Sequence, residues 1–241
     1  MTTDGGAFET LLEIQESDTA ADRLRHRRAT LAERAELTGV EQQLAALEAR
    51  LEAARARHAV VARRQATLEA EAAALERRIG EIDRRLYSGT VSASRELQAM
   101  SAEIDSLKAL CTSVEDDALA AMEEAEPLAA EVSRLEEEGT TLRAQVDRLR
   151  AAIAEGEAAI DAEVAAQEQV KARMVGSVPV ELLARYERLR AQLGGIGAAR
   201  LVGSSCSGCH LTLPMSELAR IKKRPLDELV FCDQCGRILV R

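Results

Sequence analysis

Residues 40–61 read VEQQLAALEARLEAARARHAVV, and apolar side chains recur in this stretch at alternating steps of four and three residues. The same steps continue to residue 86, and only His58 and Gln65 depart from the apolar pattern. A repeat of seven residues buries one stripe of a helix against a partner helix, so this stretch predicts a coiled coil. The positions of the seam are Val40, Leu44, Leu47, Leu51, Ala54, His58, Val61, Gln65, Leu68, Ala72, Leu75, Ile79, Ile82 and Leu86.

A second seam with the same period occupies residues 97–160. Its positions are Leu97, Met100, Ile104, Leu107, Cys111, Val114, Ala118, Ala121, Ala125, Leu128, Val132, Leu135, Gly139, Leu142, Val146, Leu149, Ile153, Gly156 and Ile160. Between the seams, residues 87–93 read YSGTVSA, where Gly89 provides turn freedom and Ser92 or Ser94 can cap the next helix. Two seams joined by so short a turn predict an antiparallel helical hairpin with its tip near 87–93.

The arms of this hairpin are predicted to have irregularities. The seam before residue 36 does not continue the later register, and Gly39 interrupts the first arm, so we expect a break near 36–40. Pro127 lies inside the second arm and lacks a backbone N–H, which predicts a bend. The predicted domains are the hairpin over 1–176, a connector helix over 177–194 and a small C-terminal domain over 195–241.

The composition argues against several classes of protein. Aromatic residues make up 2% of the chain, so no large globular core is expected. The net charge of −9 argues against a chain that coats nucleic acid by neutralising phosphates, although a local basic patch remains compatible with it. The N-terminal MTTDGGAFETLL does not have the pattern of a signal peptide, and no apolar run approaches the roughly 18 residues of a transmembrane helix. We therefore expect a cytoplasmic protein with no membrane partner.

Four of the five cysteines form two Cys-x-x-Cys pairs near the C-terminus. Residues 206–210 read CSGCH, and residues 232–236 read CDQCG. Two thiolates on one tight turn can bind a metal ion, and a second such turn completes a tetrahedron of four sulfurs. Gly208 and Gly236 suit these turns. The predicted ligands of one structural ion are Cys206, Cys209, Cys232 and Cys235.

Zinc is the expected ion, although iron in a rubredoxin-like site would use the same four sulfurs. A disulfide is disfavoured in a reducing cytoplasm, and no βαβ pattern suggests a thioredoxin-like redox site. A RING domain needs eight ligands, and only His210 remains nearby. A catalytic zinc is disfavoured because four thiolates leave no open coordination position.

The residues around the cysteines have the pattern of a zinc ribbon. A helix is predicted over 215–224, where Pro225 ends it. So small a domain has too small a core to fold alone, so the metal is expected to stabilise it by about 10–16 kcal/mol. The fold class is therefore mainly α, a long antiparallel coiled-coil hairpin followed by a small C-terminal zinc ribbon. Short apolar runs predict β-strands over 198–202, 211–213, 229–231 and 238–240.

Nearly the whole chain resembles the bacterial four-cysteine zinc-ribbon proteins that carry a long coiled-coil hairpin. The resemblance implies this same fold, no enzymatic activity, and a role in nucleic-acid binding or transcription-linked regulation. The segments that carry it are LLEIQESDTAADRLRHRRATL from residue 11, LYSGTVSASRELQAM from residue 86, VPVELLARYERLR from residue 178, CSGCHLTLP from residue 206 and CDQCGRILV from residue 232.

Two surfaces are candidates for binding a partner. Basic side chains of the ribbon could contact the phosphates of RNA or DNA, or they could be solvated residues that favour the C-terminal dipole of a helix. The hairpin tip could probe a groove of a larger assembly such as the transcription machinery, or its tyrosine could pack against the turn. The candidate residues are Arg220, Lys222, Lys223, Arg224 and Arg237 on the ribbon, and Arg84, Arg85, Tyr87 and Val91 at the tip.

Two hypotheses of function follow. The first is a non-enzymatic adaptor or regulator that binds a protein partner, a nucleic acid or both. The second is a structural coiled-coil scaffold or oligomer in which the ribbon only stabilises the fold. An enzyme is not expected, because the chain has no evident Ser/His/Asp set, phosphate-binding loop or open metal site. The sequence leaves the oligomeric state open.

Overall fold

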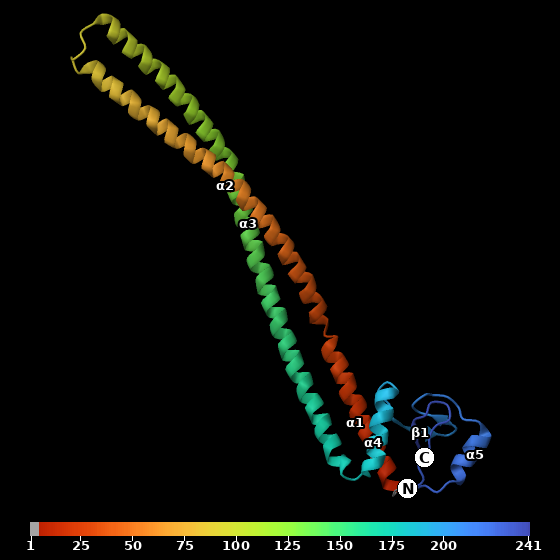
Figure 1. Ribbon diagram of the computed structural model, residues 1–241. Coiled ribbons are helices and arrows are strands. Elements are labelled where there is room, and N and C mark those ends of the chain that lie inside the picture. The colour runs from red at the N-terminus through yellow and green to blue at the C-terminus, as the bar shows by residue number, and fades with distance from the viewer. Residues whose placement is uncertain (1–4) are drawn as a thin grey trace. The chain divides into compact units, whose positions relative to one another are not determined.

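The computed structural model describes residues 5–241 and is composed mainly of helices (Figure 1). The elements are α1 (Gly5–Ala29), α2 (Ala32–Tyr87), α3 (Ser94–Val175), α4 (Val180–Gln192), β1 (Ala198–Val202), β2 (Ser205–Cys206), α5 (Met215–Lys223) and β3 (Ile238–Val240). This order confirms the predicted fold class. Residues 1–4 of the predicted hairpin domain lie outside the described residues.

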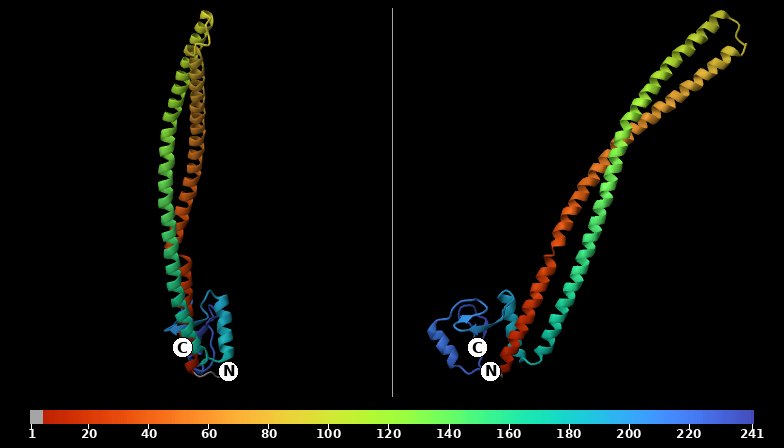
Figure 2. Two further views of the ribbon diagram at one scale, coloured as in Figure 1. Left: turned by 90° about the vertical axis from the view of Figure 1, so that its left-hand side faces the viewer. Right: turned by 180° about the vertical axis from the view of Figure 1, so that it is seen from behind.

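The chain forms two compact units. One comprises the residues up to Ala35 together with Leu149–Arg241, and we call it the ribbon-bearing unit. The other is Glu36–Arg148, which we call the hairpin unit. In the hairpin unit, α2 and α3 run antiparallel and side by side (Figure 2).

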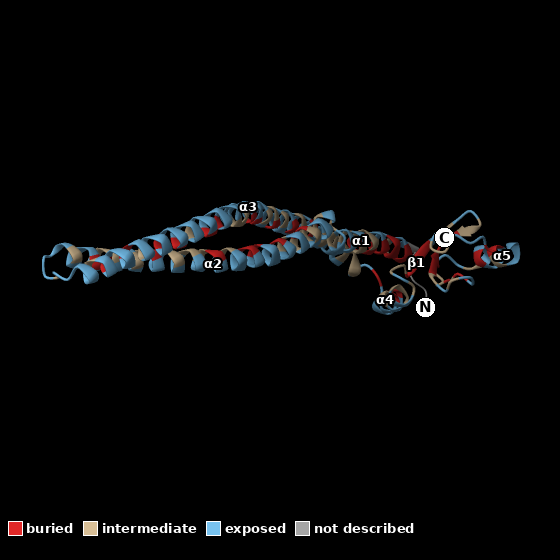
Figure 3. Ribbon diagram, turned by 90° about the horizontal axis from the view of Figure 1, so that it is seen from above, coloured by how far each residue is buried: buried red, intermediate tan, exposed pale blue. Residues whose placement is uncertain are grey.

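The predicted seam is the buried stripe of the hairpin. Every seam position from Val40 to Leu86 and from Leu97 to Val146 is buried or partly buried, and the outward faces of both helices are exposed (Figure 3). The seam is made of successive apolar clusters, such as that of Ala72, Cys111 and Val114. The heptad period therefore predicted both the partner helix and the positions that are buried against it.

Ion pairs flank the seam on the surface of the hairpin. Arg55 pairs with Glu136 at 2.6 Å, and Arg78 pairs with Glu103 at 3.3 Å. These side chains are exposed, so each pair contributes only about 0–1 kcal/mol. Their positions agree with the antiparallel pairing of α2 and α3.

The predicted break near 36–40 is wrong. Helix α2 runs continuously through Gly39, and the interruption instead lies at Thr30 and Leu31. One glycine costs a helix about 1 kcal/mol, which the neighbouring helix formers and the buried seam can offset. At the actual break, the Thr30 hydroxyl donates to the carbonyl of His26, but Thr67 and Thr140 make the same bond inside unbroken helices, so this bond does not explain the interruption. Helix α3 continues through Pro127 without a break.

In the ribbon-bearing unit, α1 packs against the ribbon as well as against helices. Its residues Phe8, Leu11 and Ile14 share a core with Tyr186 of α4 and Ile238 of β3. The first helix is thus part of the base on which the ribbon folds. The prediction that assigned residues from the N-terminus to the hairpin alone did not anticipate this contact.

The ribbon sheet has the strand order β2-β1-β3, with β2 antiparallel and β3 parallel to β1. The predicted strands at 198–202 and 238–240 are present. The predicted strands at 211–213 and 229–231 are wrong, because each contributes only an isolated bridge, at Thr212 and at Phe231. Both segments adjoin a cysteine turn, where the backbone changes direction, so the pairing of β-strands does not extend beyond one bridge.

Candidate zinc site

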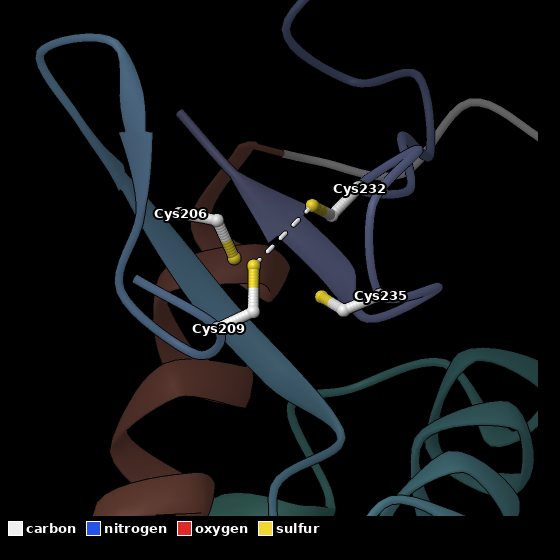
Figure 4. A group of neighbouring side chains, drawn as sticks. All are labelled: Cys206, Cys209, Cys232 and Cys235. Carbon is white, nitrogen blue, oxygen red and sulfur yellow. Dashed lines mark hydrogen bonds between the residues drawn. The ribbon is translucent and has the colours of Figure 1, made fainter. Parts of the chain in front are cut away.

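Two tight turns of the ribbon bring the four predicted cysteines together (Figure 4). Cys206 ends β2, and Cys232 lies in the turn that precedes β3. The four Sγ atoms lie within 4.8 Å of one another, and the Sγ atoms of Cys209 and Cys232 are 4.0 Å apart. Within residues 5–241, this is the one cluster of His, Cys, Asp and Glu side chains with the geometry of a metal site.

The sulfur positions fit a tetrahedral metal ion. Zinc–sulfur bonds of about 2.3 Å place the sulfurs roughly 3.8 Å apart at the corners of a tetrahedron. The 4.0 Å between Cys209 and Cys232 is close to that value and about twice the ~2.05 Å of a disulfide bond. All four are free thiols. Four sulfur ligands would fill the coordination shell of zinc, which is the arrangement of a structural site.

The two cysteine turns have the same hydrogen bonds, although their sequences differ. In the first turn, the N–H of Cys206 donates to the carbonyl of Leu211, with an N···O distance of 3.1 Å, and the N–H of His210 donates to the carbonyl of Cys206 at 2.8 Å. In the second turn, the N–H of Gly236 donates to the carbonyl of Cys232 at 2.7 Å. Each pair of cysteines is therefore held by a turn that closes one residue after the second cysteine.

The closing residue of each turn is left-handed. His210 has a φ of 60° and Gly236 a φ of 75°, a region that glycine adopts freely and other residues adopt at a cost. Gly208, which the sequence suggested for turn freedom, is not among the residues with positive φ. Glycine is required there because neighbouring side chains pack closely against its backbone. A Cβ at this position would lie 2.6 Å from Cδ of Arg237 and 2.9 Å from Cβ of Ala199.

The left-handed residues give a paired prediction. We expect His210→Gly to stabilise the ribbon by about 1 kcal/mol and Gly236→Ala to destabilise it by about 1 kcal/mol, because only glycine adopts this φ without strain. Zinc-loaded protein would be denatured with guanidinium while the exchange of ribbon amides is followed. Equal effects of the same sign from both variants would contradict this assignment of strain.

Burial and local hydrogen bonds perturb the pKa values of the thiols. Burial raises the pKa of Cys232 to about 12 and also raises the pKa of Cys206, against opposing bonds from nearby backbone amides. At Cys235, burial acts in the same sense, but hydrogen bonds from the backbone and side chain of Arg237 outweigh it and lower the pKa to about 7. Zinc binds thiolates, so loading the site releases protons, and zinc affinity is expected to fall as the pH falls.

The predicted basic residues of the ribbon differ in whether they form ion pairs with acidic side chains. Arg220 is 3.0 Å from Asp233, and Arg224 is 3.0 Å from Glu228. The exposed side chains of Lys222 and Lys223 have no partner among the described residues. The end of α5 therefore presents two free cations rather than four.

Arg237 differs from the residues at the end of α5, because its guanidinium binds backbone carbonyl groups. Its Nε donates to the carbonyl of Ile196 at 3.0 Å, and one terminal nitrogen donates to the carbonyl of Leu193 at 3.0 Å. These bonds tie the second cysteine turn to the segment that follows α4. Arg237 thus has a structural role that the sequence did not indicate.

At the hairpin tip, the predicted residues divide into exposed and packed side chains. Tyr87 is 80% exposed, so it does not pack against the turn. Arg84 and Arg85 are exposed, and Arg85 pairs with Glu96 at 3.2 Å. Val91 is partly buried against the last apolar cluster of the seam.

Sequence reasoning missed a buried polar network that joins α1 to the rest of the ribbon-bearing unit. Asp18 is 7% exposed and accepts a hydrogen bond of 2.7 Å from the hydroxyl of Tyr186. The ammonium of Lys171 lies 3.1 Å from both carboxylate oxygens of Asp18, and Nε of Arg190 lies 3.5 Å away. Burial and the bond to Asp18 raise the pKa of Tyr186, so its hydroxyl stays a donor.

Gln15 completes this network toward the ribbon. Its side-chain oxygen accepts from the N–H of Gly197 at 2.7 Å, and its side-chain nitrogen donates to the carbonyl of Gly195 at 2.9 Å. Gln15 and Asp18 share a helix face with Leu11 and Ile14 at steps of three and four residues. The presence of Gln15 and Asp18 on an otherwise apolar helix face was the signal in the sequence that could have indicated this network.

Comparisons with known proteins agree with this geometry. Residues 14–194 match the CT398-like coiled coil hairpin domain, and residues 205–239 match the C4-type zinc ribbon domain. These matches, the hairpin and the cysteine cluster define a coiled-coil hairpin protein with a four-cysteine zinc ribbon. The chain belongs to the CT398-like coiled-coil hairpin family.

Related proteins share the fold over most of their length. An uncharacterized protein of Mycobacterium tuberculosis is 33% identical over 156 residues, which are 65% of this chain and 63% of that protein. A structure from Mycobacterium smegmatis covers 100% of both chains at 26% identity with a TM-score of 0.88. The structure of CT398 from Chlamydia trachomatis has 20% identity and a TM-score of 0.66, covering 98% of this chain and 97% of its own. This last similarity concerns the fold alone.

Among the described residues, none of the helices combines sufficient length with sufficient apolarity to cross a bilayer.

Proposed function

We propose that this protein is a non-enzymatic adaptor that binds a protein partner through the tip of its hairpin. The observation that carries the proposal is the exposure of Tyr87. The chain has four aromatic residues, of which Phe8 and Tyr186 are buried and Phe231 is partly buried. Tyr87 is 80% exposed at the end of α2. Tyrosine is enriched in the energetic centres of protein interfaces, so one left in solvent is a candidate contact residue.

The neighbours of Tyr87 support the same proposal. Arg84 is exposed, and its Nε donates to the carbonyl of Gly80 at 3.0 Å, which leaves its terminal nitrogens for a partner. Arginine and tyrosine together are typical of binding hot spots. The turn itself is held by the hydroxyl of Ser88, which donates to the carbonyl of Arg85 at 2.8 Å.

An adaptor without catalysis is supported by the chemistry of the zinc site. Four thiolates would leave zinc no coordination position for a substrate. The matched families are a coiled coil and a zinc ribbon. Nucleic-acid contact at the end of α5 and a link to transcription stay predictions. A scaffold or oligomer is the competing function.

Site-specific crosslinking tests the tip. We would replace Tyr87 by the photo-crosslinking amino acid benzoylphenylalanine in cells and use Val60, which is 60% exposed on the same helix, as the control position. The proposal expects a reproducible adduct with one protein from position 87 and not from position 60. With that protein purified, Tyr87→Ser should weaken binding at least about tenfold.

Other outcomes would overturn the proposal. Adducts with a second copy of the chain, accompanied by concentration-dependent association in sedimentation, would favour the scaffold. Equal labelling from positions 60 and 87, or none from position 87, would show that the tip does not select a partner. Identification of a subunit of the transcription machinery in the adduct would extend the proposal to transcription.

A further inference from the structure

The sequence RLRHRR at residues 23–28 places five basic residues within two turns of α1. Helical geometry separates them onto two faces. Arg25 pairs with Asp22 at 2.9 Å and with Glu168 at 2.6 Å, and Arg28 lies 2.9 Å from Asp161. These two arginines are therefore neutralised by acidic partners.

The other three basic residues have no such partners. Arg23, His26 and Arg27 are exposed, and within residues 5–241 their side chains make no hydrogen bond or ion pair. They lie at steps of three and four residues and line one wall of an open groove of about 580 Å³. The groove also includes the segment from Gly194 to Ile196, which follows α4.

That segment forms a defined floor for the groove. The side chain of Gln15 holds the carbonyl of Gly195, and the N–H of Gly195 donates to the carbonyl of Arg190 at 2.9 Å. Both Gly194 and Gly195 have positive φ, and a Cβ at Gly195 would come 3.4 Å from the carboxylate of Asp22. The two glycines of the floor thus present bare backbone that another chain can approach closely.

The charge of the groove is positive. The one acidic residue that lines it is Asp22, whose carboxylate is held by Arg25 at 2.9 Å and by the guanidinium of Arg190. The cations Arg23 and Arg27 are separated by four residues, or about 6 Å along the helix. This local patch contrasts with the net charge of −9 for the whole chain.

We propose that the α1 face of Arg23, His26 and Arg27, with the floor at Gly194–Ile196, binds the phosphate backbone of a single-stranded nucleic acid. Unpaired arginines are the side chains that recognise phosphate best, because their planar fork donates two hydrogen bonds. A patch one helical turn long matches a few successive phosphates of one strand. The groove has no Phe, Tyr or Trp for base stacking, so the expected binding is independent of sequence.

The test is the salt dependence of binding to a fluorescein-labelled 20-residue oligouridylate. We expect Arg23→Gln with Arg27→Gln to weaken binding roughly 10- to 30-fold at 0.1 M salt. The slope of log K against log salt should fall by about 1.4, which is 0.7 for each of two phosphate contacts. The matched control is Arg50→Gln with Arg77→Gln, which removes the same charge from two exposed arginines of α2.

The two double variants distinguish a site from a general charge effect. Because all four side chains are exposed, zinc content and circular dichroism should be unchanged in both variants. Loss of affinity in the α1 variant and not in the α2 variant supports the proposal. Equal losses in both variants, a loss in the α2 variant alone, no measurable binding by the wild-type protein, or stronger binding to a 20-base-pair duplex would overturn it. The tip variant Tyr87→Ser should leave this binding unchanged, so the groove is tested separately from the proposed function.

Discussion

Cys232→Ser is expected to abolish zinc binding and to unfold the ribbon while the hairpin stays helical. Cys232 is buried in the ribbon core with Ala199, Leu213 and Leu239, a small cluster that cannot stabilise the domain alone. Structural zinc in such domains contributes about 10–16 kcal/mol, which is more than the roughly 3–5 kcal/mol that the hydrophobic core of so small a domain supplies. We expect one zinc ion per chain in the wild type by elemental analysis and none in the variant. Hydrogen exchange should become fast over residues 198–240 and stay slow in α2 and α3.

The matched control is Cys111→Ala, which removes the fifth cysteine. Cys111 is buried in the hairpin seam beside Ala72 and Val114, so the change should leave zinc content and ribbon protection intact. Treatment of the wild-type protein with a strong zinc chelator should reproduce the exchange pattern of Cys232→Ser. A ribbon that stays protected after complete loss of zinc would show that the metal is not structural, and iron in purified protein would correct its identity.

Asp18→Ala is expected to have the next largest effect, a loss of about 3–5 kcal/mol from the ribbon-bearing unit. The change leaves the hydroxyl of Tyr186 without an acceptor and leaves Lys171 and Arg190 partly buried without a shared counter-ion. Burial lowers the pKa of Lys171, but its bonds to Glu187 and Asp18 outweigh burial and raise it, so this ammonium remains charged in the folded protein. Urea unfolding followed by exchange of α1 and α4 amides would measure the loss.

The control for this prediction is Asp22→Ala, one turn further along α1. The side chain of Asp22 is 41% exposed, against 9% for Asp18, and water can replace its bonds to Arg25 and Arg190. We therefore expect a loss of no more than about 1 kcal/mol. If the two alanine variants were equally stable, the burial of Asp18 would not carry the energy assigned to it here.

Patterns that depend on local repetition were predictable from the sequence. The heptad seam predicted α2 and α3 and their buried positions, because a seven-residue period determines which stripe a helix must cover. The two Cys-x-x-Cys pairs predicted the metal cluster, because four thiolates at this spacing have few other stable arrangements. The tip followed from Gly89 and from the short turn between the two seams.

Features that depend on contacts between distant segments were not predictable. The break at Thr30 and Leu31 was assigned to Gly39, because glycine is the strongest helix-breaking residue in that part of the sequence. The strands predicted at 211–213 and 229–231 failed because the cysteine turns curl the backbone beside them. The cluster at the end of α5 gave two free lysines, because Arg220 and Arg224 found partners at Asp233 and Glu228.

The basic run at residues 23–28 shows the same limit. Its composition is visible in the sequence, but only folding decides which arginines meet Glu168 and Asp161 on α3 and which face the groove. The sequence by itself determined the elements whose energy comes from short, repeated spacings, namely the hairpin seam and the cysteine turns. The tertiary structure alone decided the docking of α1 through Gln15 and Asp18 and the set of charges left unpaired, because the partner of a buried polar group or an ion pair can lie as far as 191 residues away in the sequence.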